Sequence, residues 1–172
     1  NKVTGTECAA VVKANAYGLG ALPITQILLH QGCRTFFVAQ LNEVPPIAKS
    51  IKKHAGRIFV LNGITQRTVS QLLELGAIPV LSTIREIEIW QQHGWPYPPA
   101  LQIDTGFNRL GLAPLNELHE TISSNNYALL MSHLACADDE NHDMNEQQRQ
   151  NFLERSSLIC AQQKSLANSA GI

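Results

Sequence analysis

Apolar and polar residues follow one another along the chain in short blocks, and the apolar blocks are rich in β-branched and aromatic residues. Such blocks predict β-strands. Six of them stand out, at residues 8–14, 35–40, 57–63, 77–82, 100–106 and 128–137. Most are apolar at consecutive positions, which is typical of parallel strands buried on both faces.

Between the strands, apolar residues recur at the spacing of amphipathic helices, within residues 24–28, 72–75 and 84–90. Helix boundaries are also marked. Thr83 with Glu86 predicts a capping box, and Pro45 with Pro46 suits the first turn of a helix. Glycines stand where three helices should end, at Gly32, Gly76 and Gly94. The mostly polar stretch 144–161 is expected to be a helix lying on the surface.

The strand–helix order repeats six times, which predicts parallel βα units. An open doubly wound sheet and an eight-unit barrel both have this order. A complete (β/α)8 barrel needs roughly 250 residues, and this chain has 172. We therefore expect an α/β fold, an incomplete parallel (β/α)8 TIM-type barrel of about six units, or a fragment of a longer polypeptide.

Composition narrows the function classes. Charged residues make up 16% and apolar residues 44%, with a net charge of −1, so we expect a globular protein with no nucleic-acid or membrane partner. The sequence contains neither a membrane-spanning run nor a visible signal peptide, and it starts at Asn1, as a trimmed chain would. The four cysteines form no CxxC pair, which favours free thiols in a reducing cytoplasm.

Residues 11–20, "VVKANAYGLG", carry the main chemical signal. Lys13 follows an apolar run, where burial and nearby positive charge favour the neutral amine that acts as a nucleophile or base. Such a lysine forms Schiff bases with aldehydes. A lysine that extends from the strand end into solvent is the alternative.

Other polar residues follow later strands, and the carboxyl ends of barrel strands form the working face. Residues 102–112 are "QIDTGFNRLGL", residues 132–139 are "SHLACADD", and the chain finishes on "ANSAGI" at 167–172. We expect these segments to meet Lys13 at one mouth.

The motifs resemble those of one family. "AVVKANAYGLG" resembles the pyridoxal-phosphate lysine signature of bacterial alanine racemases, and "IDTGFNRLGL" and "MSHLACADD" are similar to their fifth-strand and sixth-strand motifs. "NSAGI" resembles their phosphate-loop segment, and "FFVAQLNEV" their second strand and following helix start. The resemblance implies an eight-fold α/β barrel followed by a β-rich domain, in a homodimer. Residues 1–172 would be part of the barrel domain, with the C-terminal β domain absent.

The resemblance also implies residue roles. Lys13 would hold pyridoxal 5'-phosphate as an internal aldimine and act as one of two catalytic bases. Tyr17 and Ser169 would bind the cofactor phosphate, and Asn168 and His133 would lie against the ring. Without the motifs, Tyr17 would be a half-buried aromatic, His133 a satisfied core residue, and residues 168–171 a surface turn.

Arg109 would orient the substrate carboxylate, a role that suits a planar fork of donors. A surface ion pair with Asp104 or Glu117 is the alternative. Asp104 is expected to shape the loop. Gln102 stands where many relatives carry a carbamylated lysine, so we expect its amide oxygen to accept from Arg109 without a negative charge.

The function implied is racemisation of L- and D-alanine, which supplies D-alanine for peptidoglycan in the cytoplasm. The family's second base, a tyrosine, and its arginine facing the pyridine nitrogen lie outside the chain, so the chain alone should be inactive. Serine or broad-specificity racemases, decarboxylases of basic amino acids and non-catalytic pyridoxal-phosphate-binding barrel proteins share parts of the pattern. A zinc site in 133–143 is a weaker alternative, because the spacing matches no closed ligand set.

Overall fold

A computed structural model describes residues 6–113 and 120–171. The chain divides into two compact units, residues 1–80 and residues 81–172. Each unit contains parallel strands that pair in sequence order, with helices between them. Within the described ranges, every helix is too short or too polar to cross a lipid bilayer.

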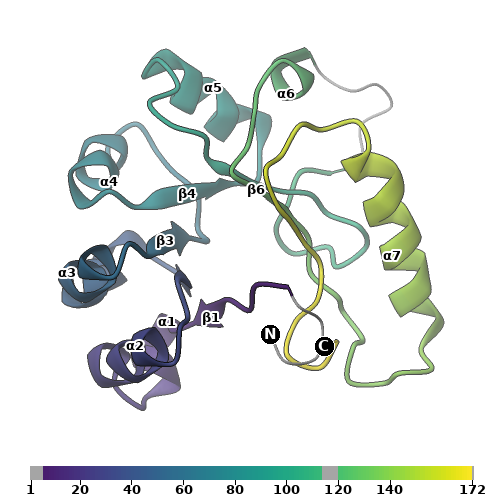
Figure 1. Cartoon of the computed structure of the whole chain (residues 1–172). Coiled ribbons are helices and arrows are strands. Elements are labelled where there is room, and N and C mark those ends of the chain that lie inside the picture. The colour runs from purple at the N-terminus through teal and green to yellow at the C-terminus, as the bar shows by residue number, and fades with distance from the viewer. Residues whose placement is uncertain (1–5, 114–119, 172) are drawn as a thin grey trace. The chain divides into compact units, whose positions relative to one another are not determined.

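The first unit is built on four parallel strands. They are β1 (Ala10–Val11), β2 (Thr35–Val38), β3 (Arg57–Val60) and β4 (Ile78–Leu81), the last ending at the boundary between the units. The helical elements are α1 (Lys13–Tyr17), α2 (Ala21–His30), η1 (Leu41–Glu43), α3 (Pro45–Lys53) and α4 (Val69–Leu75). Helices α2, α3 and α4 lie on the same side of these strands (Figure 1).

The core of the first unit comes from the apolar runs of the sequence. Phe36, Val38 and Phe59 are fully buried, and the rings of Phe37 and Phe59 stack with centroids 5.0 Å apart. Both faces of β2 are buried, which confirms the prediction from its unbroken apolar run.

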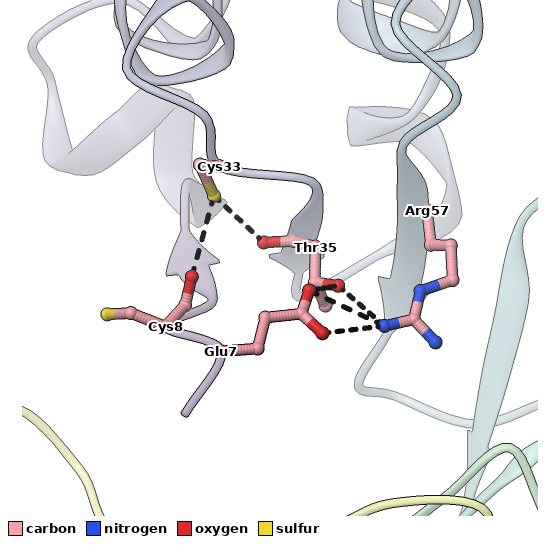
Figure 2. A network of polar contacts seen from close by, with 5 residues as sticks. All are labelled: Glu7, Cys8, Cys33, Thr35 and Arg57. Atoms are coloured by element: carbon pink, nitrogen blue, oxygen red, sulfur yellow. Dashed lines mark hydrogen bonds and ion pairs between the residues drawn. The ribbon is translucent and has the colours of Figure 1, made fainter. Parts of the chain in front are cut away.

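A network of polar contacts lies at the amino-terminal end of β1, β2 and β3 (Figure 2). The Arg57 guanidinium donates to the Glu7 carboxylate at 3.1 Å and to Thr35 Oγ1 at 2.9 Å. The thiol of Cys33 donates to the carbonyl of Thr35 at 3.4 Å, and burial raises its pKa. Glu7 precedes β1 and Cys33 precedes β2, while Thr35 and Arg57 are the first residues of β2 and β3. Lys13 lies beyond the carboxyl end of β1, so the network lies at the strand ends opposite to the lysine.

The second unit contains three parallel strands. They are β5 (Ala100–Gln102), β6 (Leu129–Met131) and β7 (Lys164–Ser165). Its helices are α5 (Ile84–Gln92), α6 (Glu120–Ser123) and α7 (Asp143–Ser156). Trp90, Leu101, Ile122 and Tyr127 are fully buried in its core.

Local boundary signals are confirmed. Thr83 Oγ1 accepts from the N–H of Glu86, whose carboxylate accepts from the N–H of Thr83, so the capping box is present. Helix α3 begins at Pro45, and α4 ends at Leu75 with Gly76 as its C-cap, which adopts the left-handed conformation with φ 65°.

Three expectations need correction. The run 8–14 contributes only Ala10–Val11 as strand, because the backbone turns at Lys13. The helix expected over 144–161 covers Asp143–Ser156 and buries one face, Gln148 included. A seventh strand, Lys164–Ser165, adds to the six predicted; two polar residues carry no strand pattern of their own.

Candidate functional site

The lysine turn, residues 13–18, follows β1 in the first unit. The N–H of Val12 still donates to the carbonyl of Phe37 on β2 at 2.9 Å. The next residue, Lys13, is partly buried. From Ala14 to Tyr17 the backbone winds left-handed, with φ between 50° and 55°. Non-glycine residues adopt this conformation at a cost of roughly 1–2 kcal/mol each, so contacts elsewhere must hold the turn.

Those contacts lie at both ends of the turn. At its end, the N–H of Gly20 donates to the carbonyl of Asn15 at 2.9 Å, and the N–H of Ala21 donates to Asn15 Oδ1 at 2.8 Å. At its start, the N–H of Ala14 donates to Glu43 Oε1 at 2.6 Å. The lysine is thereby followed by a fixed backbone rather than a free loop.

The turn places Tyr17 near Lys13. Lys13 Nζ lies 6.0 Å from the centroid of the Tyr17 ring. Tyr17 is 64% exposed, which rules out the alternative that it is a half-buried packing residue in this unit. Its hydroxyl is therefore available to a ligand that contacts the lysine.

In the second unit, the loop after β5 is organised by Asp104, as expected. Asp104 Oδ1 accepts from the N–H groups of Gly106, Phe107 and Asn108, at 2.9–3.1 Å. One carboxylate oxygen that accepts three N–H groups makes the backbone turn tightly before Arg109.

Phe107 brings Arg109 and His133 together. The guanidinium carbon of Arg109 lies 4.2 Å from the centroid of the Phe107 ring, and the His133 ring meets the same ring edge-on, with centroids 5.1 Å apart. The described residues include no ion pair between Arg109 and Asp104, and Glu117 lies outside the described residues.

Gln102 does not act as expected. It is buried, and its Nε2 donates to the carbonyl of Leu110 at 3.1 Å. No hydrogen bond joins it to Arg109 in the described structure. Its contribution is to hold the chain just after Arg109. Gly111 completes this close approach, because at φ 121° a Cβ there would lie 2.7 Å from the backbone nitrogen of Asp104.

Helix α7 supplies residues that were not predicted. Gln148 is fully buried, and its Nε2 donates to the carbonyl of His133 at 2.9 Å and to Thr105 Oγ1 at 3.2 Å. Its Oε1 accepts from the N–H of Ala135 at 2.8 Å. One amide thus joins the segments that follow β5 and β6.

Two further α7 side chains hold the β5 loop. Asn151 Nδ2 donates to the carbonyl of Thr105 at 3.2 Å, and the Arg155 guanidinium donates to the carbonyls of Asp104 and Leu112. Burial lowers the pKa of Arg155, and Asp104 partly opposes that shift. Residues 148, 151 and 155 form a stripe at helical spacing, which is the sequence signal that could have found them.

The final turn of the second unit is arranged by Asn168. Its Oδ1 accepts from the N–H groups of Ala170 at 3.2 Å and Gly171 at 3.1 Å, and its Nδ2 donates to the carbonyl of Leu134 at 3.3 Å. Ser169 lies exposed in the same turn. Asn168 therefore connects this turn to the residue after His133.

The predicted site residues fall into two groups. Lys13 and Tyr17 belong to the first unit, and Arg109, His133, Asn168 and Ser169 to the second. Each group is brought together within its own unit. That the two groups form one active site stays a prediction.

The cysteines, the acidic segment and a surface recess add no further candidate site among the described residues. All four cysteines are free, and the described residues contain no group of three or more potential metal ligands, the acidic segment 133–143 included. A recess of about 240 Å³ in the first unit is lined by parts of α3, β3 and α4 and contains none of the predicted site residues.

Parallel strands that pair in sequence order, with helices between them, define a protein of the βα class. The chain matches the family "Alanine racemase, N-terminal domain" over residues 1–172. It therefore belongs to the alanine racemase family, and its fold is the α/β TIM-type barrel of that domain, incomplete in this chain.

Individual relatives agree. An alanine racemase of Rhodospirillum rubrum is 40% identical over 98% of this chain and 47% of its own length. The crystal structure of alanine racemase from Bartonella henselae, with covalently bound pyridoxal phosphate, superposes with a TM-score of 0.87 at 36% identity, covering 98% of this chain and 52% of that one. A histidine racemase from Leuconostoc mesenteroides superposes with a TM-score of 0.75 at 26% identity, covering 95% and 47%. The chain spans about half the length of these relatives.

Proposed function

We propose that this chain is the barrel part of a pyridoxal-phosphate-dependent racemase that interconverts L-alanine and D-alanine. The observation that carries the proposal is Lys13, placed two residues after the end of β1 and followed by a left-handed turn, in a chain of the alanine racemase family. The Bartonella henselae relative, described with covalently bound pyridoxal phosphate, supports the cofactor.

The donor set fits this cofactor. Lys13 offers an amine that is partly shielded from water, and the neighbouring Tyr17 offers an exposed hydroxyl. Ser169 offers a second hydroxyl in a turn of small residues. An aldehyde needs the first group, and a phosphate suits the other two. When bound, pyridoxal phosphate supplies an electron sink that lets the proton on the substrate Cα leave near neutral pH.

Each of these residues is proposed to have a separate role. Lys13 holds the cofactor aldehyde and moves the proton at the substrate Cα on one face. Tyr17 and Ser169 bind the phosphate. Arg109 orients the substrate carboxylate, because its guanidinium is held against Phe107.

The remaining cofactor contacts come from the second unit. Asn168 and His133 are proposed to lie against the ring. His133 is suited to this because its ring packs on Phe107 and its carbonyl accepts from Gln148. Inversion at Cα also needs a second base on the opposite face of the substrate. We propose that this second base comes from outside residues 1–172.

We further propose that residues 1–172 belong to a longer polypeptide, called the full-length protein below. It would add a C-terminal β domain carrying the second base, form a homodimer, and work in the cytoplasm to supply D-alanine for peptidoglycan. The coverage of about half of each relative supports this extension.

The amino acid is less narrowly defined than the reaction. A histidine racemase shares the fold at 26% identity, so the barrel part is compatible with more than one side chain. A serine or broad-specificity racemase is the second candidate for the same residues. A non-catalytic pyridoxal-phosphate-binding protein is the third.

The test compares the full-length wild type with Lys13→Ala, using Lys53→Ala at an exposed lysine as the matched control. Cofactor absorbance that depends on Lys13, together with interconversion of D- and L-alanine, is the expected result. Serine and histidine are assayed in parallel to rank the substrates. Absence of Lys13-dependent absorbance contradicts the proposal. Cofactor binding without turnover of any amino acid favours the third candidate, a non-catalytic pyridoxal-phosphate-binding protein.

A further inference from the structure

Glu43 and Glu86 make the same local contacts, yet one of them does more. Glu86 Oε2 accepts from the N–H groups of Ser82 at 2.7 Å and Thr83 at 3.1 Å, four and three residues earlier. Glu43 Oε2 accepts from the corresponding groups of Ala39 at 2.7 Å and Gln40 at 2.8 Å. In both cases one oxygen caps the start of a helix.

The second oxygen distinguishes them. Glu43 Oε1 accepts from the N–H of Ala14 at 2.6 Å, across 29 residues of sequence. Ala14 directly follows Lys13 and is the first residue of the left-handed turn. A charged acceptor makes a shorter and stronger hydrogen bond than a neutral one, which suits a backbone that must be kept in a conformation it otherwise avoids.

The geometry points to Glu43 as a positioning residue for Lys13. We propose that its carboxylate clamps the start of the left-handed turn to the end of β2 and so fixes the direction in which the lysine side chain leaves the backbone. Asn15 holds the other end of the turn through Ala21. This inference rests on the proposed function of Lys13, but the clamp itself is a property of the polypeptide without any ligand.

The pair of glutamates supplies a matched experiment. Glu43→Gln and Glu86→Gln in the full-length protein weaken the same local cap, and only the first also loses the charge that faces Ala14. We expect Glu43→Gln to bind pyridoxal phosphate about tenfold more weakly and to lower kcat more than it raises KM for alanine, since one charged hydrogen bond is worth about that factor. Glu86→Gln is expected to stay within about twofold of wild type.

A second measurement needs no cofactor. Residue-resolved hydrogen exchange on the cofactor-free wild type should show a protected Ala14 amide, with protection lost in Glu43→Gln and kept in Glu86→Gln. An unprotected Ala14 amide in the wild type overturns the clamp, even if Glu43→Gln fails to fold.

Failure of the inference differs from failure of the proposed function. A wild type without Lys13-dependent cofactor absorbance contradicts the function. A wild type that binds cofactor through Lys13, with both glutamine variants equal in cofactor affinity and Ala14 exchange, leaves the function standing and removes Glu43 from it.

Discussion

Gln148→Met tests how the second unit holds the segments around His133. The side chain of Gln148 is fully buried and makes three hydrogen bonds, with the carbonyl of His133, the hydroxyl of Thr105 and the N–H of Ala135. Methionine is unbranched and fills a similar space, so the change removes the polar contacts with little cavity.

The magnitude follows from what is left behind. Thr105 Oγ1 keeps a second partner, Ser132 Oγ at 2.8 Å, and loses little. The carbonyl of His133 and the N–H of Ala135 each lose the partner supplied by Gln148. Both groups are only partly buried, and one intramolecular hydrogen bond contributes about 0.5–1.5 kcal/mol, so the free energy of unfolding should fall by about 2 kcal/mol.

The assay is denaturant unfolding of the full-length protein followed by far-UV circular dichroism, with hydrogen exchange of the Ala135 amide beside it. Gln147→Met, at the exposed neighbour on the same helix, is the control and should change the free energy by less than about 0.5 kcal/mol. If the two variants unfold alike and Ala135 stays protected in both, the buried amide does not hold the two segments.

Two tyrosines of the second unit provide further predictions. The hydroxyl of Tyr127 is buried and has no hydrogen-bond partner in the part of the chain that the structure describes, so Tyr127→Phe should leave thermal stability unchanged or raise it by up to about 1 kcal/mol; a clear loss of stability would contradict this. Burial raises the pKa of Tyr97 to about 12, above the value of about 10 in an unfolded chain. Both states keep the proton below pH 10, and the unfolded state loses it first between pH 10 and 12, so the free energy of unfolding should fall as pH rises through this window. The free energy of unfolding of Tyr97→Phe should fall less steeply with pH than that of the wild type in this window. Equal slopes for the two proteins would contradict the raised pKa of Tyr97.

Much of the fold was predictable because its signals are local. A capping box involves residues three apart, and Thr83 with Glu86 forms one as expected. A proline suits only the first turn of a helix, and α3 begins at Pro45. The loop role of Asp104 was also predictable, since its carboxylate reaches N–H groups two to four residues ahead.

The site was predictable in part. Lys13 and Tyr17 lie near one another in the structure, but the left-handed path between them was not expected. Alanine and tyrosine disfavour that conformation, a single asparagine is only a weak signal for it, and Gly18 and Gly20 mark only where the turn ends. Gln148 was assigned to a surface helix because a glutamine in a polar stretch is usually exposed.

The sequence by itself determined six of the strands, several of the helices, their parallel order and the family, because hydrophobic periodicity and short motifs act over a few residues. Only the tertiary structure decided which polar groups hold the reactive segments. Glu43 reaches Ala14 across 29 residues, and Gln148 reaches Thr105 across 43. Whether an amide or carboxylate finds a buried backbone partner depends on how separate elements pack, and no local pattern of residues records that distance.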